Sequence, residues 1–336
     1  MSPPQASQDF MILHHFEASP FSEKIRLVLG HKRATWHSVH VPRILPKPDL
    51  MPLTGGYRRT PVLQIGRDIY ADTRLIVREI DRRLPTPPLV PAAQAVSVRA
   101  LESLGDQQMF LAAIPVLLSA DGQRALTAQL GADGLAAFRA DRAALFASGD
   151  AGAPDAQFSA SIWQPSLMAL EAQLAGRAFV LGAAPTLADF ALYHPVWYVR
   201  GNTGVADALN AYPAILAWAE RMAAIGHGNP QPMESTDALA VACDAPDFEP
   251  LMSAIEPSLA WAAGQRVQVA ATDYGSDPVE GQLVHADTER VVIEREAAGL
   301  GRLRNHFPRH GFHVAPAGSV SGHRSPSSSV YTETAS

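Results

Sequence analysis

A proline-dense segment divides the chain and restricts what can lie on either side of it. The segment "PTPPLVPAA" spans residues 85–93, and prolines so close together cannot continue a helix or sit inside a central strand. The chain has 336 residues, which is long for a single hydrophobic core. The sequence therefore predicts several domains, with the first boundary at this segment.

The part before the boundary, residues 1–84, has the pattern of a small α/β domain. β-type runs and helical periods follow one another in the order βαβ and then ββα. The strands are expected at 10–16, 35–41, 60–66 and 67–71, and the helices at 19–32 and 72–84. The last two strands read as a hairpin that turns at Gly66, Arg67 and Asp68.

The parts after the boundary differ in composition from the first part and from each other. Residues 95–245 are rich in Ala and Leu with helical spacing, which predicts an all-α domain. Residues 258–316 hold short β-type runs separated by Gly, Asp and Pro, a pattern typical of a small all-β domain of the SH3-like barrel type. Residues 317–336 are Ser-rich with few large apolar side chains, so a disordered tail is expected.

The charge pattern excludes several classes of protein. The formal net charge is −6, yet the first 83 residues carry 13 Lys and Arg against 8 Asp and Glu. This local excess suits a small anion, but it is too weak to indicate a nucleic-acid partner. No apolar run has the length needed to cross a bilayer, so no membrane partner is expected.

The N-terminal residues and the single cysteine bear on location and redox chemistry. The opening "MSPPQASQDFMILHHF" lacks the basic and apolar regions of an export signal, and a cytoplasmic location is therefore expected. Cys243 is the one cysteine and cannot form an internal disulfide. The sequence therefore predicts neither a cysteine-based metal site nor internal dithiol chemistry.

Three positions in the first domain could hold a ligand. Ser19 stands at the N-cap of the first helix, where free N–H groups and the helix dipole favour an anion. Thr60 precedes Pro61 at the start of a strand, and a cis bond there would leave its backbone free to pair with an extended ligand. Asp72 and Thr73 open the next helix and could hold a carboxylate and a neighbouring ammonium. Each position alone is also explained as a helix cap or a strand start.

Together these positions resemble the glutathione site of glutathione S-transferases. The resemblance rests on "SPFSEKIRLVL", "RRTPVLQIG" and "ADTRLI", in the family's order, and the first is similar to the omega-type pattern with Ser19 in place of a cysteine. In the second domain "PTLADFALYHPVWY" resembles the family's capping box, here Thr186 with Asp189, and "YPAILAWAERMAAI" resembles a later helix. The ordered set covers about residues 9–245, and it implies a thioredoxin-like N-terminal domain followed by the family's helical domain.

The resemblance also implies a mechanism. Glutathione would be the co-substrate, with its cysteinyl part at Thr60 and Pro61, its γ-glutamyl end at Asp72 and Thr73, and its sulfur facing Ser19. A serine cannot form a mixed disulfide, which disfavours thiol transfer and reduction, so Ser19 is predicted to stabilise the thiolate of glutathione for attack on a small hydrophobic electrophile. Conjugation, glutathione-dependent isomerisation and dehalogenation all remain open. Ser22 is the alternative hydroxyl.

The family resemblance further implies a homodimer and a role in detoxification. A second hypothesis makes the protein a non-catalytic scaffold whose C-terminal β-domain mediates protein interaction. The aromatic residues considered for the electrophile pocket are Phe16, Phe110, Trp163 and Trp197, none of them firmly.

No metal site is expected from the histidines of "NHFPRHGFH". The segment contributes His306, His310 and His313, whose spacing straddles Pro308 and Gly311. This spacing does not match a usual metal-binding pattern, so the sequence favours structural or solvated roles.

Overall fold

The computed structural model describes residues 10–152, 154–246, 248, 251, 255–256 and 261–318. The first region has the predicted thioredoxin-like order, with one additional short helix. Its elements are β1 (Ile12–His15), α1 (Pro20–His31), β2 (Thr35–His40), α2 (Leu50–Thr54), β3 (Val62–Ile65), β4 (Asp68–Ala71) and α3 (Thr73–Arg83).

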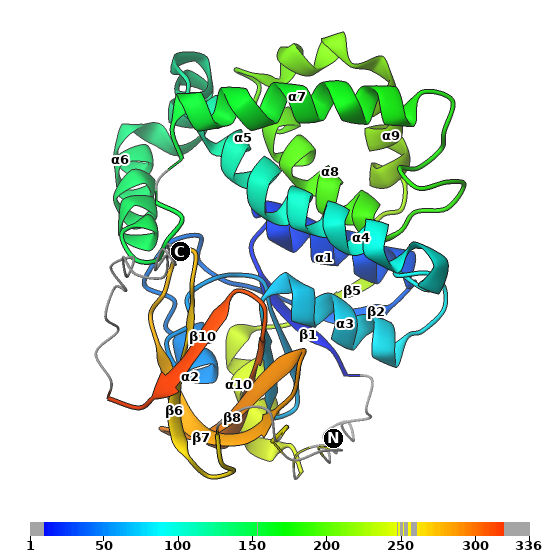
Figure 1. Ribbon diagram of the computed structural model, residues 1–336. Helices are drawn as coiled ribbons and strands as arrows, with labels where there is room; N and C mark the ends of the chain where they lie inside the picture. The colour runs from blue at the N-terminus through cyan, green and yellow to red at the C-terminus, as the bar shows by residue number, and fades with distance from the viewer. Residues whose placement is uncertain are drawn as a thin grey trace, which may run out of the picture.

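The four strands of this region form one sheet between two layers of other elements. β1 lies parallel to β2 and antiparallel to β3, and β3 pairs antiparallel with β4. α1 and α3 contact each other and lie between the sheet and the helical region, whereas α2 lies on the side of the sheet near the C-terminal strands (Figure 1). The expected hairpin is confirmed, because β3 ends at Ile65 and β4 begins at Asp68.

The second region consists mainly of helices that cover α1 (Figure 1). The elements of this region are η1 (Ala92–Gln94), α4 (Ala95–Ser103), η2 (Leu104–Met109), α5 (Phe110–Leu117), α6 (Ala120–Phe146), α7 (Ala156–Leu174), α8 (Leu187–Arg200), η3 (Ala206–Ala211), α9 (Pro213–Ala223) and α10 (Ser235–Asp244). α8 packs on α1 and lies against α4, α5 and α9. No helix of the described ranges is both long enough and apolar enough to cross a membrane.

The capping box predicted at the start of α8 is present. Thr186 is the N-cap, and the Asp189 side chain accepts hydrogen bonds from the N–H groups of Thr186 (2.9 Å) and Val180 (2.8 Å). The indole N–H of Trp218 on α9 also donates to Asp189 at 3.1 Å. One buried carboxylate thus fixes the start of α8 and its contact with α9.

The prediction of an all-helical segment up to residue 245 was wrong in one place. The segment β5 (Asn229–Pro232) is a strand that pairs in parallel with β2 at the edge of the sheet. Its sequence "NPQP" has no alternating apolar pattern and all four side chains are exposed, so it lacks the usual signal of a strand. Prolines are tolerated here because β5 is an edge strand.

The C-terminal strands curl into the predicted small β-domain and also extend the first sheet. They are β6 (Arg266–Ala271), β7 (Val279–Ala286), β8 (Arg290–Ala297), β9 (Gly301–Pro308) and β10 (Phe312–Pro316). The sheet order is β10-β6-β7-β8-β9-β4-β3-β1-β2-β5, so the last strand lies beside the first of the five, and β9 pairs in parallel with β4. Residues 258–260 of the predicted domain and 319–336 of the predicted tail lie outside the described residues.

Polar and apolar contacts join β9 to β4. His306 Nε2 lies 2.7 Å from Asp68 Oδ1, and the His306 ring stacks on Tyr70 at 4.3 Å between centroids. Val62 and Ile69 share a buried cluster with residues of the β-domain such as Leu283 and Phe307. The β-domain is therefore packed into the first domain through a common sheet and a common core.

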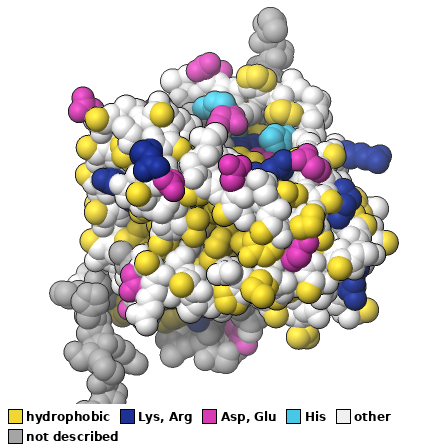
Figure 2. Space-filling view, turned by 90° about the horizontal axis from the view of Figure 1, so that it is seen from above, with side chains coloured by type: hydrophobic (Ala, Val, Ile, Leu, Met, Phe, Trp, Pro, Cys, Tyr) yellow, Lys and Arg dark blue, Asp and Glu magenta, His cyan; other side chains and the backbone are white. Residues whose placement is uncertain are grey.

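The outer face of the helical region is partly apolar. Figure 2 shows hydrophobic side chains gathered across the middle of this face, with charged side chains around them. Val96 on α4 and Met168 on α7 are large hydrophobic residues that are 84% and 60% exposed.

Candidate functional site

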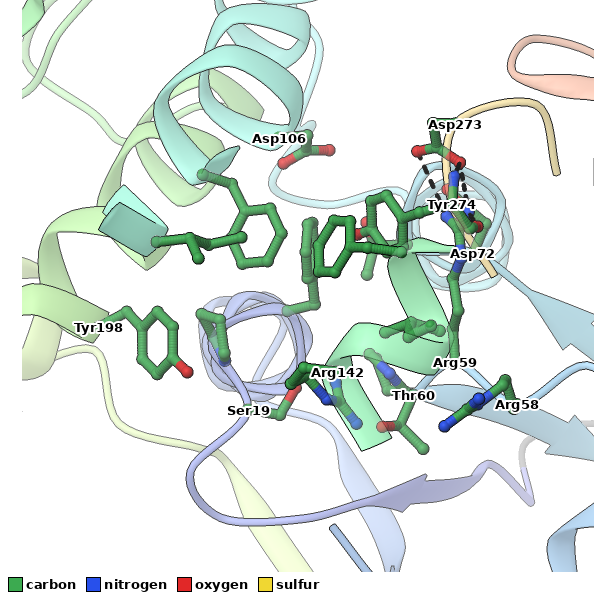
Figure 3. A pocket seen from close by; sticks show the side chains of 18 of the residues that line it. Ser19, Arg58, Arg59, Thr60, Asp72, Asp106, Arg142, Tyr198, Asp273 and Tyr274 are labelled. Atoms are coloured by element: carbon green, nitrogen blue, oxygen red, sulfur yellow. Dashed lines mark hydrogen bonds and ion pairs between the residues drawn. The ribbon is translucent and has the colours of Figure 1, made fainter. Parts of the chain in front are cut away.

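One cavity of about 390 Å³ lies where the three regions meet. It brings together all five predicted site residues, which come from three separate segments of the first domain (Figure 3). They are Ser19, Thr60, Pro61, Asp72 and Thr73. Its volume lies within the usual range for a small-molecule site.

Ser19 is the N-cap of α1 and faces the cavity. Its Oγ accepts a hydrogen bond from the Ser22 N–H at 3.1 Å, and the residue is 3% exposed. This bond uses one lone pair, so the hydroxyl proton stays available to a ligand. Ser22 is fully buried and does not line the cavity, and its Oγ has no hydrogen-bond partner among the described residues. Between the two hydroxyls, Ser19 is the one placed to meet a ligand.

Thr60 offers an open stretch of backbone beside Ser19. The Thr60–Pro61 peptide bond is cis, and β3 begins at the next residue, Val62. Within the described ranges, no group hydrogen-bonds to the backbone N–H or C=O of Thr60. These two groups can therefore pair with an extended peptide-like ligand, as an edge strand does.

Asp72 and Thr73 form a polar corner at the start of α3. Asp72 has a positive φ of 71° and is the N-cap, with its Oδ1 accepting from the Arg74 N–H at 3.0 Å. Its second carboxylate oxygen is the natural partner for an ammonium, while the Thr73 N–H at the start of α3 suits a carboxylate. Both Asp72 and Thr73 line the cavity.

The β-domain supplies part of the cavity wall, which the sequence did not predict. Asp273 forms an ion pair with Arg59, and the Arg59 guanidinium lies 4.0 Å from the centre of the Tyr274 ring (Figure 3). His310, from the turn between β9 and β10, lines the cavity as well. The sequence could not predict that these residues line the cavity, because their position there depends on the pairing of β9 with β4.

The apolar wall comes from α1 and the helical region. Phe21 and Phe110 contact each other edge to face with centroids 4.6 Å apart, and both line the cavity together with Phe16. Trp163 and Trp197 do not line it, since Trp163 belongs to the helical core and Trp197 packs against that core. Of the four aromatic candidates, the structure places only Phe16 and Phe110 at the cavity.

A buried ion cluster fixes α1 against the helical region beside the cavity. Lys24 Nζ lies 2.6 Å from Asp106 and 3.4 Å from Glu102, and His194 Nε2 lies 3.1 Å from Asp106. Burial alone would raise the pKa of the Asp106 carboxyl, but the Lys24 ammonium and the His194 hydrogen bond lower it to about 2. Asp106 lines the cavity as a charged group already paired to Lys24.

The arrangement does not indicate a metal site among the described residues. His15, Glu17 and His40 offer ligand atoms within 4.8 Å of one another. However, His15 Nε2 is bonded to Ser38 Oγ at 2.8 Å and Nδ1 to the Arg26 guanidinium at 3.1 Å, so neither nitrogen is available. His306 is bonded to Asp68 at the strand junction, and this structural role agrees with the sequence expectation.

Comparisons with known proteins agree with this geometry. Residues 13–88 match the family described as "Glutathione S-transferase, N-terminal domain". Residues 136–221 match the family described as "Glutathione S-transferase, C-terminal domain". A search of curated proteins found no match.

Solved structures give a further comparison. A GST-like protein from Pseudomonas syringae is 33% identical, and the match covers 92% of this chain and 99% of that one with a TM-score of 0.75. A glutathione S-transferase from Rhodospirillum rubrum F11 is 19% identical over 62% of this chain and 86% of that one, with a TM-score of 0.47. Another, from Methylobacillus flagellatus KT with GSH bound, is 22% identical over 66% and 100%, with a TM-score of 0.49.

The match to the Pseudomonas syringae protein decides the family. It covers too much of this chain to leave out the β-domain, so the two proteins share the three-part architecture and not the transferase body alone. Its identity and coverage, together with the two domain matches, lead to one conclusion. The chain belongs to the glutathione S-transferase superfamily.

Proposed function

We propose that the protein is an enzyme that activates the thiol of glutathione for attack on a small electrophile with an apolar body. The observation that carries this proposal is that Ser19, the open backbone of Thr60 and the Asp72–Thr73 corner line one cavity. An extended tripeptide needs these three elements, namely a partner for its sulfur, a partner for its backbone, and a partner for its charged γ-glutamyl end.

Ser19 is proposed to act on the sulfur as a hydrogen-bond donor. The Ser19 hydroxyl would donate to the thiolate, and the positive N-terminal end of α1 would stabilise the same charge. Both effects lower the pKa of the glutathione thiol. The thiol proton passes to water, and the thiolate sulfur attacks the electrophilic carbon. The carbon–sulfur bond forms as the bond to the leaving group breaks, and that group departs with its electron pair.

The β-domain favours the enzyme over the scaffold hypothesis. Asp273, Tyr274 and His310 of this domain line the cavity, and Asp273 is paired with Arg59 next to Thr60. A module that served only to bind other proteins would not need to complete the wall of a small-molecule cavity.

A thiolate titration tests the proposal. The ultraviolet absorbance of the thiolate is followed against pH for free glutathione and for glutathione bound to the protein. The pKa of the bound thiol is expected to fall by at least one unit, which corresponds to about 1.4 kcal/mol of differential stabilisation. An unchanged thiol pKa, with no turnover of a panel of electrophiles, would contradict the enzyme and leave the scaffold hypothesis ahead.

The quaternary structure, the cellular location and the biological role are further parts of the proposal. We expect a homodimer, because twofold pairing is the commonest form of soluble oligomer and hydrophobic side chains gather on the helical face (Figure 2). Light scattering measures the mass directly, and a mass equal to one chain would contradict the dimer. A cytoplasmic location and a role in detoxification remain predictions from the sequence.

A further inference from the structure

One end of the cavity carries positive charge that its acidic groups do not balance. The lining includes seven Lys and Arg side chains but three Asp side chains. Asp273 is paired with Arg59, Asp106 is paired with Lys24, and Asp72 caps α3. Four of the other cations form a group that we name the basic end, made up of Arg43, Lys47, Arg58 and Arg142.

Asp141 holds the basic end together. Its carboxylate forms ion pairs with Arg58 and Arg142, each at 2.5 Å, and accepts the Leu45 N–H at 3.1 Å. Arg142 also donates to the Arg43 carbonyl at 3.3 Å. Within the described ranges, Asp141 pairs with two of the four cationic side chains, and neither Arg43 nor Lys47 forms an ion pair with a carboxylate, so most of the positive charge is left for a ligand.

Lys47 shows this imbalance in a buried position. It is 4% exposed, and its ammonium donates to the Arg58 carbonyl at 3.0 Å without a carboxylate partner among the described residues. Burial, and then the nearby Arg142, lower the pKa of Lys47 to about 8, although Asp141 acts in the opposite direction. A buried ammonium without a counter-ion is costly, and a bound anion would offset that cost.

An apolar surface lies directly beside these charges. The Arg43 and Arg142 guanidinium carbons lie 4.1 and 5.3 Å from the centre of the Phe138 ring, and Lys47 Nζ lies 5.8 Å from that of Phe16. Phe138 and Phe16 both line the cavity. A ligand that fits here has an apolar body next to a negative group.

We propose that the electrophilic substrate carries a carboxylate next to its apolar body, and that Arg43, Lys47 and Arg142 bind this carboxylate. The inference rests on the proposed function and narrows its substrate class. Glutathione has a glycyl carboxylate of its own, which can use part of this positive charge. Four cationic side chains with one aspartate among them leave enough charge for a second carboxylate, that of the electrophile. Arg142 and Ser19 line the same cavity (Figure 3), which fits an electrophile bound in that cavity together with glutathione.

Calorimetry with a matched pair of ligands tests this recognition. The probes are 4-chloro-3-nitrobenzoate and 4-chloro-3-nitrobenzamide, which differ in charge but little in shape. The protein is first saturated with S-methylglutathione, which has no free thiol and cannot react. The benzoate is expected to bind at least about tenfold more tightly than the benzamide, as the gain of a charge-assisted hydrogen bond implies.

Variants locate the effect at the basic end. Arg43→Gln is expected to weaken the benzoate about tenfold and to leave the benzamide unchanged. Arg124→Gln is the matched control, because Arg124 is 73% exposed at its side chain and does not line the cavity. It should change neither affinity.

The outcomes separate this inference from the proposed function. If S-methylglutathione binds but the two probes bind equally, or Arg43→Gln weakens both alike, the carboxylate site is overturned and the proposed function stands. If S-methylglutathione does not bind, the proposed function fails. In that case, a preference of the protein for the benzoate that is lost in Arg43→Gln still supports the carboxylate site. Equal affinities of the protein for the two probes overturn the carboxylate site as well.

Discussion

Ser19 illustrates how one side chain can stabilise a helix and face a ligand at the same time. Its Oγ caps α1 through the Ser22 N–H, so Ser19→Ala should cost about 1 kcal/mol of stability. The loss of the donor should also raise the pKa of bound glutathione and lower kcat/KM roughly tenfold or more. Kinetics of Ser19→Ala and Ser19→Thr check this, since threonine keeps the hydroxyl. If Ser19→Ala keeps full activity, or Ser22→Ala loses it instead, Ser19 has no catalytic role.

Buried histidines on β1 make the stability depend on pH. Burial lowers the pKa of His14 to about 4, although the hydrogen bond that His14 donates to Gln64 Oε1 acts against it, and burial and Arg26 lower the pKa of His15 to about 3. Because both pKa values lie below the ordinary 6.5, the unfolded chain binds these protons more readily than the folded protein does. The free energy of unfolding is therefore at its full value above pH 6.5 and decreases as the pH falls toward 4. Each histidine should account for roughly 2 kcal/mol of the loss by pH 5.

Denaturant unfolding at pH 7.5 and 5 measures this loss. His14→Gln should reduce the difference between the two pH values by roughly 2 kcal/mol, whereas His313→Gln, on the exposed surface of β10, should leave it unchanged. An unchanged difference in His14→Gln would show that His14 is not the titrating group.

At the scale of single elements, the start of α8 depends on Asp189. Its side chain accepts from two backbone N–H groups and from the Trp218 indole in a fully buried position. Asp189→Ala leaves these donors unsatisfied and should lower the free energy of unfolding by about 3 kcal/mol. Denaturant unfolding measures it, with Asp207→Ala, at an exposed position of η3, as the control. A loss below about 1 kcal/mol would contradict this role.

The sequence predicts elements well where local chemistry specifies them. Ser19 with Pro20 marks the start of α1, Gly66 and Arg67 mark the hairpin, and Thr186 with Asp189 marks α8. β5 was missed because "NPQP" gains its strand conformation from pairing with β2. The basic end was also missed, because Arg43 and Arg142 lie 99 residues apart in sequence and meet only after α6 packs on the first domain.

At the scale of the whole molecule, the sheet joins regions that the sequence separates. β9 pairs with β4 and the buried Asp68–His306 pair lies at that junction, so the β-domain and the first domain should open together. His306→Ala should lower the protection of β4 and β9 amides equally, by about 3 kcal/mol. Hydrogen exchange measures both strands at once, with His313→Ala as the exposed control. Faster exchange in β9 alone would show that the β-domain opens independently.

A crystal structure of the protein with glutathione tests whether the three segments that carry Ser19, Thr60 and Asp72 bind one tripeptide. Glutathione should lie extended in the cavity, with its sulfur within hydrogen-bonding distance of Ser19 Oγ. Its cysteinyl backbone should pair with Thr60 and its γ-glutamyl end should contact Asp72 and Thr73. Glutathione bound elsewhere, or bound with its sulfur turned away from Ser19, would contradict the account.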